Sequence, residues 1–210
     1  MKLAIFGTGG HGRAILDGVS QECVFLDDHV AKGAVVNGVK VAGGIELLSN
    51  RDFLNSHVII IGVGDCKTRG VLSRLVKSYG GKLANVFHPS AIVSRTDVRI
   101  GDGTAIMPFA LIGPNVRIGE YCIVNNRATI AHDSIVENGV NVSDGACFTA
   151  TVGEEAWIGL NVSIIPKVRI GARSIVGAGS VVTREVKPDT TVAGVPARFL
   201  RMGGTHGVVA

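Results

Sequence analysis

The sequence predicts an α/β domain followed by a parallel β-helix. Two observations carry this prediction. Residues 1–85 alternate short apolar strands with helical segments, and from His88 onward aliphatic residues recur every six positions. The composition agrees, because 29 glycines and only 5% aromatic residues favour many turns and thin, regular packing over a bulky aromatic core.

The first part of the chain indicates a small βαβ unit. Three short apolar runs are typical of buried parallel strands: Leu3–Phe6, Val24–Leu26 and Val58–Ile61. Three further segments have helical character: Arg13–Val19, Ile45–Asn50 and Lys67–Ser78. The last of these has an apolar face. We therefore expect a small parallel sheet flanked by helices.

A glycine motif follows the first predicted strand. Gly7, Gly9 and Gly12 match GxGxxG before a helix, and Asp27 and Asp28 follow the second strand. This pattern is typical of a dinucleotide site, but a domain of this size is only half of a dinucleotide fold and supplies no nicotinamide site. A glycine loop at a helix N-terminus can bind any phosphate, so we expect another nucleotide here. A tight turn without a ligand is the alternative.

The second part of the chain carries a six-residue repeat. Counted from its aliphatic residue, each hexad also has a small or branched residue in fifth place. After Phe148 the register shifts, because the next first position is Val152 and one hexad is two residues short. A hexapeptide repeat predicts a β-helix, in which three hexads form one triangular coil. The strands of a β-sandwich are spaced about 8–12 residues apart, which disfavours that alternative.

Composition and charge exclude several functions. The net charge of +4 is mild, and no basic patch is interleaved with aromatic residues, so no nucleic-acid partner is expected. The four cysteines form no CxxC pair, so neither a disulfide framework nor a zinc site is predicted. No apolar run approaches the roughly 18 residues of a membrane span, and the apolar start is too short for a signal peptide. We expect a cytoplasmic protein with no membrane partner.

One histidine interrupts the repeat. In TIAHDSIVENGVNV, His132 occupies an outward corner of its hexad and is followed by Asp133. An imidazole is largely unprotonated at neutral pH, and a neighbouring carboxylate can hold one of its tautomers. The pair suits general-base catalysis, although an ordinary surface histidine is the alternative. It is the single histidine between residues 100 and 200, so the three-histidine zinc site known on this kind of fold is not expected.

The order of motifs resembles that of a known enzyme family. The segments IFGTGGHGRAILD, VFLDD, VGDCKTR, HPSA, NNRATIAHD and VAGVPARFL follow one another as in the sialic-acid O-acetyltransferase and bacillosamine/perosamine N-acetyltransferase family, a group of hexapeptide-repeat sugar acetyltransferases. The resemblance implies a Rossmann-like half-domain that binds a nucleotide-sugar at residues 1–85. It implies a left-handed parallel β-helix that binds acetyl-CoA and performs catalysis at residues 86–198, with a C-terminal tail at 199–210.

The resemblance also implies a role for each site residue. His132 would be the general base, with Asp133 as its acidic neighbour. The residues expected to hold the nucleotide-sugar acceptor are Gly9, Gly10, His11, Asp27, Asp28 and Gly64. The residues expected to contact acetyl-CoA, the co-substrate, are Asn125, Asn141, Ala150, Leu160 and Ala178. Family members often have histidine at the position of Asn141, and they place a backbone amide near Ala150 against the acetyl carbonyl. Basic residues that could meet the CoA phosphates are Arg169, Arg173, Arg184 and Lys187.

The predicted function is transfer of an acetyl group from acetyl-CoA to the amine of a nucleotide-linked amino-deoxysugar. The alternative within the same class is O-acetylation of sialic acid or a similar sugar hydroxyl. From another class, the protein could be an idle scaffold or a nucleotide-sugar carrier. Apolar residues expected on the flat faces, Trp157, Leu160 and Ile165, predict a cyclic homotrimer with active sites between subunits.

Overall fold

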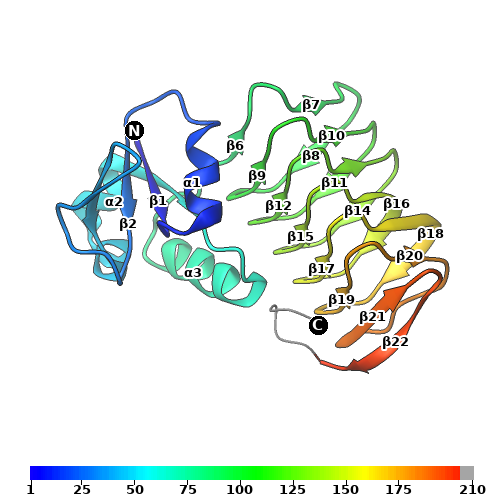
Figure 1. Ribbon diagram of the computed structural model, residues 1–210. Coiled ribbons are helices and arrows are strands. Elements are labelled where there is room, and N and C mark those ends of the chain that lie inside the picture. Colours follow the sequence, from blue (N-terminus) through cyan, green and yellow to red (C-terminus); the bar gives the residue numbers. More distant parts are fainter. Residues whose placement is uncertain (204–210) are drawn as a thin grey trace.

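A five-stranded sheet forms the N-terminal domain in the computed structural model, which describes residues 1–203 (Figure 1). The strands lie in the order β3-β4-β2-β1-β5. Their bounds are β1 Lys2–Phe6, β2 Cys23–Leu26, β3 Val35–Val36, β4 Val39–Gly43 and β5 His57–Ile61. The strands β4, β2, β1 and β5 run parallel, as in a Rossmann-like half-domain, and the three expected strands form the centre and one edge.

The pair β3 and β4 is an addition to the predicted sheet. It is an antiparallel hairpin whose turn is Asn37–Gly38, and both of these residues have positive φ, 49° and 79°. An Asn-Gly pair between short strands is a strong hairpin signal, and the sequence VNGV carries it. The prediction missed the hairpin because it relied on apolar runs, and β3 is too short to form one, so that the signal lies in the turn alone.

Helices cover the N-terminal sheet. Their bounds are α1 Gly10–Leu16, α2 Arg51–Ser56 and α3 Cys66–Ser78, with a 3₁₀ turn at Ile45–Ser49. The predicted helix at 45–50 is thus the 3₁₀ turn, and Asn50 caps α2 by accepting a hydrogen bond from the Phe53 amide. Helix α3 begins after Asp65, whose carboxylate accepts from the amide of Thr68. Within residues 1–203, no helix is both long enough and apolar enough to cross a membrane.

From β6 to β20 the chain winds into a left-handed parallel β-helix of short strands. Their bounds are β6 Val86–Phe87, β7 Ile92–Val93, β8 Arg99–Ile100, β9 Ala105–Ile106, β10 Leu111–Ile112, β11 Arg117–Ile118, β12 Ile123–Val124, β13 Thr129–Ile130, β14 Ile135–Val136, β15 Asn141–Val142, β16 Cys147–Val152, β17 Trp157–Ile158, β18 Ser163–Ile170, β19 Ile175–Val176 and β20 Val181–Val182. Through most of the column a strand pairs with the strand three hexads further on, as Ile118 does with Val136. The aliphatic first residues and the small fifth residues fill the interior.

At the short hexad predicted after Phe148, one corner of the β-helix is interrupted. Strand β16 pairs with both β13 and β14, so it runs across two faces of the triangular coil. Its pairing with β18 shifts register between Phe148 and Ala150. Two missing residues have therefore removed a turn and left a continuous bent strand with a bulge.

Backbone hydrogen bonds align the three corners of the coils along the column. The first corner contains Pro108, Asn126, Asp144, Leu160 and Ala178. The second corner contains Thr96, Pro114 and His132. The third corner contains Asp102, Glu120, Asn138, Glu154 and Ala172. In each turn the next residue takes positive φ, as Arg127 and Asp133 do at 56° and 58°.

The N-terminal domain packs against the face between the third and the first corner. This face holds β9, β12, β15, β17 and β19, which lie nearest the N-terminal helices in Figure 1. Lys77 of α3 contacts Glu120 of the third corner at 2.7 Å. The second corner, which carries His132, lies between the two other faces. His132 and the glycine loop of the N-terminal domain are therefore on opposite sides of the β-helix.

An antiparallel hairpin ends the column. It consists of β21, Thr190–Gly194, and β22, Ala197–Met202. Strand β21 pairs in parallel with β19 and so extends the face that the N-terminal domain covers. The segment 199–210, expected to be a tail, thus begins as part of β22, and residues 204–210 lie outside the described structure.

Candidate active site

The His132 imidazole is paired with the carboxylate of Asp133. Its Nδ1 lies 2.8 Å from Asp133 Oδ2, and the carboxylate also accepts a hydrogen bond from Asn115 Nδ2 at 3.0 Å. The bond from His132, followed by that from Asn115, lowers the pKa of Asp133. An ionised carboxylate only accepts, so Nδ1 carries the proton and Nε2 is left as the basic nitrogen. The two side chains are 65% and 63% exposed.

Asn115 is a member of this group that the sequence analysis missed. It lies 18 residues before Asp133, which is one coil of the β-helix. Residues three hexads apart stack at the same corner. A search one coil before and one coil after each candidate would therefore have identified Asn115 from the sequence.

The glycine loop of the N-terminal domain is open where a ligand would approach it. A Cβ on Gly12 would lie 1.9 Å from the Gly7 carbonyl oxygen, so internal packing requires glycine there. By contrast, a Cβ on Gly9, Gly10 or Gly64 would meet no atom within 4 Å. Packing does not explain glycine at these three positions, whereas close approach of a ligand to the backbone would.

The adjacent carboxylates of Asp27 and Asp28 have different hydrogen-bond partners. Asp27 Oδ2 accepts from the amide and hydroxyl of Thr8, at 2.8 and 2.7 Å, and Oδ1 accepts from the His29 amide. Burial alone would raise the pKa of Asp27, but the hydrogen bonds, led by the Thr8 hydroxyl, outweigh it and lower the pKa. Asp27 thus fastens the glycine loop.

Asp27 and Asp28 both line a pocket of about 360 Å³ at the carboxyl ends of β2 and β4, and Asp28 is the more exposed of the two. One of its oxygens accepts from the Ile45 amide at 2.7 Å. Glu46 and the backbone of Gly43 and Gly44 also line the pocket. In open α/β sheets ligands bind at this edge, beyond the carboxyl ends of the strands.

His11 is a partly buried histidine beside the glycine loop. Its Nε2 has no hydrogen-bond partner among the described residues. Burial, followed by the charge of Arg69, lowers the pKa of His11 to about 4. The ring is therefore neutral near pH 7, and this Nε2 is enclosed by the protein.

Three of the predicted residues are joined in a chain of amide contacts. Asn125 Nδ2 donates to Asn141 Oδ1 at 3.0 Å, and Asn141 Nδ2 donates to the Gly64 carbonyl at 3.2 Å. Asn141 is only 8% exposed. These contacts connect residues predicted to bind acetyl-CoA with a residue predicted to bind the acceptor.

The other residues predicted to contact acetyl-CoA differ in where they lie on the β-helix. Leu160 and Ala178 lie on the first corner, in the same column as Asn126 and next to Asn125. Ala150 is buried, and its amide donates to the hydroxyl oxygen of Ser134 at 3.2 Å. The Ala150 amide is therefore already satisfied inside the β-helix and does not face the surface.

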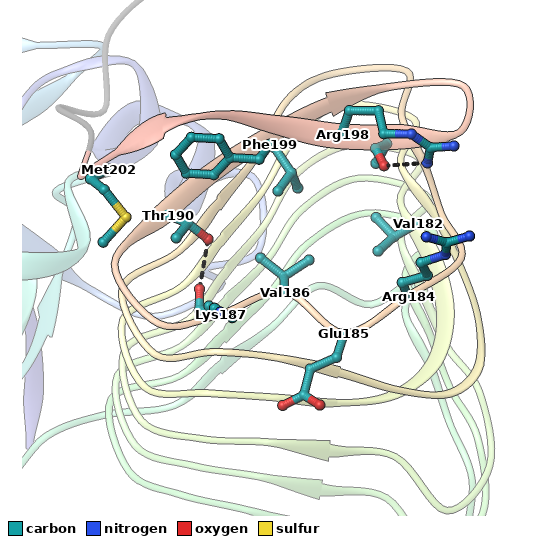
Figure 2. Close-up of a pocket in the computed structure, with 11 residues that line it drawn as sticks. Val182, Arg184, Glu185, Val186, Lys187, Thr190, Arg198, Phe199 and Met202 are labelled. Atoms are coloured by element: carbon teal, nitrogen blue, oxygen red, sulfur yellow. Dashed lines mark hydrogen bonds between the residues drawn. The ribbon is translucent and has the colours of Figure 1, made fainter.

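A separate cavity of about 420 Å³ lies under the C-terminal hairpin. Figure 2 shows Phe199 and Met202 above Val182 and Val186, with Arg184 at the rim. Of the four basic residues considered for the CoA phosphates, Arg184 and Lys187 line this cavity. Arg173 instead forms two hydrogen bonds with Asp189, at 2.7 and 2.8 Å, so its guanidinium is already occupied.

Two family descriptions match the chain. "Bacterial transferase hexapeptide (six repeats)" matches residues 97–132 and 149–184, and "PglD N-terminal domain" matches residues 2–75. Among curated proteins, the galactoside O-acetyltransferase of Escherichia coli is 31% identical over 147 residues, which are 56% of this chain and 72% of the relative.

Solved structures match almost the whole chain. The acetyltransferase domain of PglB from Neisseria gonorrhoeae is 32% identical, with a TM-score of 0.90 over 95% of this chain and 99% of the other. PerB from Caulobacter crescentus, in complex with CoA and GDP-perosamine, is 32% identical, with a TM-score of 0.87 over 96% and 98%. The PglB domain has also been solved in complex with acetyl coenzyme A.

A column of hexads joined to a Rossmann-like half-domain defines the class of hexapeptide-repeat acyltransferases. Within that class, the chain belongs to the family of sugar acetyltransferases that includes the bacillosamine and perosamine N-acetyltransferases. It is an acetyl-CoA-dependent sugar acetyltransferase, with acetyl-CoA as co-substrate.

Proposed function

We propose that this enzyme acetylates the amine of a nucleotide-linked amino-deoxysugar, with His132 as the general base. The observation that carries the proposal is the His132–Asp133 pair, which leaves Nε2 of His132 free to accept a proton. The similarity to PerB, solved with CoA and GDP-perosamine, supports a nucleotide-linked amino sugar as acceptor. The open glycine loop and the pocket beside Asp28 supply a place for its nucleotide.

The proposed reaction is direct transfer in a ternary complex. The acceptor nitrogen attacks the thioester carbonyl while Nε2 of His132 takes a proton from that nitrogen. The new C–N bond forms, the C–S bond breaks, and the proton passes to the departing thiolate of CoA. The products are the N-acetyl sugar and CoA. Asp133, held by Asn115, keeps Nδ1 protonated and stabilises the imidazolium that forms.

The proposed site is complete only between subunits. His132 is on the second corner, whereas the glycine loop and Asn141 are on the side that the N-terminal domain covers. The exposed His132–Asp133 pair also lacks the shielding from water that strengthens catalytic electrostatics. A neighbouring subunit that brought its N-terminal domain and first corner against His132 would provide both.

The face between the first and second corners is suited to that contact. Its outward column includes Ile92, Leu111 and Cys147, which line up through strand pairing and are exposed in the single subunit. The face between the second and third corners instead presents Arg99 and Arg117. We propose that the uncharged face forms the interface of a cyclic homotrimer, with acetyl-CoA in the groove along the first corner.

We further propose that residues 1–85 hold the acceptor and residues 86–198 hold acetyl-CoA. Because the co-substrate is acetyl-CoA, we place the enzyme in the cytoplasm, where reduced cysteines such as those found here are usual. Thioester consumption measured with a panel of UDP- and GDP-linked amino sugars, and with sialic acid, tests the function. Turnover with a nucleotide-linked amine is expected. Turnover only with a hydroxyl acceptor would favour O-acetylation, which the similarity to the galactoside O-acetyltransferase makes the second candidate.

A further inference from the structure

The motif VGDCKTR contains a residue that the proposed reaction does not use, Arg69. This residue lies in the first part of α3 and is completely buried. A buried guanidinium is costly unless its donors are satisfied, so its surroundings indicate what it is retained for.

Arg69 makes four hydrogen bonds, and all four acceptors are backbone carbonyls. On the N-terminal domain, Nη1 donates to Val63 at 2.9 Å and to Gly64 at 2.8 Å. On the third corner of the β-helix, Nε donates to Tyr121 at 2.8 Å and Nη2 donates to Gly139 at 2.6 Å. Four of its five N–H groups are thus shared between the acceptor-side loop and the β-helix.

The Gly64 carbonyl connects the hydrogen bonds of Arg69 with the proposed site. It accepts from Arg69 and also from Asn141 Nδ2. Asn141 in turn accepts from Asn125. A backbone carbonyl with two lone pairs is thereby fixed from two directions, by a helix of its own domain and by the β-helix.

We propose that Arg69 is a positioning residue that fixes the Val63–Gly64 loop against the β-helix in the orientation that binds the nucleotide-sugar. This role rests on the proposed function but concerns binding of the acceptor and not the chemical step. Lysine cannot replace it fully, because an ammonium is a point donor and cannot reach four carbonyls in one planar fork.

The test compares Arg69→Gln and Arg69→Lys with the matched control Arg74→Gln. Arg74 lies on the same helix and at the same domain junction, where it contacts Glu155 and the Tyr121 hydroxyl, but its side chain is 53% exposed and does not contact Gly64. For Arg69→Gln the KM of the acceptor should rise at least about tenfold while kcat falls much less, the pattern of lost uniform binding. Arg69→Lys should lie between this variant and the wild type, and Arg74→Gln should match the wild type.

A purely structural role would give a different result. Arg69→Gln would then lower the melting temperature but leave the KM and kcat of the folded enzyme unchanged, and the proposal would be overturned. Absence of turnover in the wild type would contradict the proposed function and not the role of Arg69. In that case calorimetry with GDP and with UDP still tests Arg69, because binding should weaken about tenfold in Arg69→Gln relative to Arg74→Gln, and equal affinities would overturn the proposal.

If neither Arg69 variant folds, hydrogen exchange on the wild type provides the measurement. Adding GDP or UDP should slow amide exchange in the loop 62–65 and also in the backbone around Tyr121 and Gly139, because Arg69 joins these segments. Protection confined to the N-terminal domain would overturn the proposal.

Discussion

Nδ1 of His132 lies 2.8 Å from Oδ2 of Asp133, while the opposite oxygen of the same carboxylate is held by Asn115. The carboxylate therefore orients the imidazole from an adjacent residue in the same corner. Asp133 has a φ of 58°, a left-handed conformation that aspartate tolerates better than most residues. The turn that places the carboxylate beside the ring is thus also a regular corner of the β-helix.

Removing this imidazole should stop the chemistry without disturbing the fold. His132→Ala should lower kcat by at least about 10²-fold, since a general base is lost. Stability should change little, because the side chain is largely exposed. Steady-state kinetics and thermal unfolding check both expectations. A variant that keeps more than about half of wild-type turnover would rule out His132 as the base.

Changing the partner should have a smaller effect than changing the base. Asp133→Asn should reduce kcat less than His132→Ala does, because the amide can still orient the ring but no longer stabilises the imidazolium. Asn115→Ala should reduce it less again, because it removes one of two bonds to the carboxylate. A larger effect at Asn115 than at Asp133 would contradict this order.

A site shared between subunits should show complementation. We choose Gly9→Glu as the second inactive variant, because Gly9 has open space around it and an added carboxylate should repel a diphosphate without disturbing folding. When trimers of His132→Ala and Gly9→Glu subunits are mixed and reassembled in equal amounts, about a quarter of the sites should combine an intact His132 with an intact loop. Activity should return, although each variant alone is inactive. No recovery would place the whole site within one subunit.

Substitution of Asp27 and substitution of Asp28 should have different effects on binding and stability. Asp28→Ala should raise the KM of the acceptor and leave that of acetyl-CoA unchanged, because Asp28 is exposed at the pocket that both aspartates line. Asp27→Ala should mainly destabilise the protein, by about 1–3 kcal/mol, because it removes the acceptor of Thr8 and His29 donors. Asp52→Ala, an exposed aspartate on α2, is the control. Equal loss of both substrates in Asp28→Ala would argue against the division between the domains.

Burial of His11 should make the protein less stable toward acid pH. Its pKa of about 4 in the folded state lies below the ordinary value of 6.5, so the unfolded chain binds more protons as the pH falls below about 6.5. The resulting loss grows until about pH 4, and it should reach about 2 kcal/mol between pH 7 and pH 5. Chemical denaturation at both pH values should show a smaller loss for His11→Asn than for the wild type. His29→Asn, which replaces an exposed histidine, should behave as the wild type.

Much of the fold was predictable because each coil of the β-helix is encoded by three copies of a six-residue repeat. Ile118 and Val136 pair directly because each is the first residue of its hexad, and the short hexad after Phe148 predicts an irregularity that the structure shows as a bulge. The βαβ strands were also found from apolar runs. The hairpin of β3 and β4 was missed because its signal lies in a two-residue turn and not in the hydrophobic pattern.

The arrangement of the site was less predictable. The repeat predicts that His132 lies at a corner of the β-helix. It does not predict which face the N-terminal domain packs against, because that depends on contacts between residues far apart in the chain. Arg69 reaches Gly139, 70 residues away, through a carbonyl that any residue type would supply. Backbone acceptors leave no side-chain signature, so the sequence marks Arg69 only as part of a motif.

The hairpin of β21 and β22 lies at the C-terminal end of the β-helix. A stack of parallel coils presents unpaired backbone groups at its last turn, and these could add the first coil of another molecule. Strand β22 runs antiparallel to β21 and covers the edge of the face that contains β21, so another parallel coil cannot continue this face. The hairpin therefore blocks end-to-end stacking on this one face, and a chain cut before Ala197 should associate end to end more readily as its concentration rises.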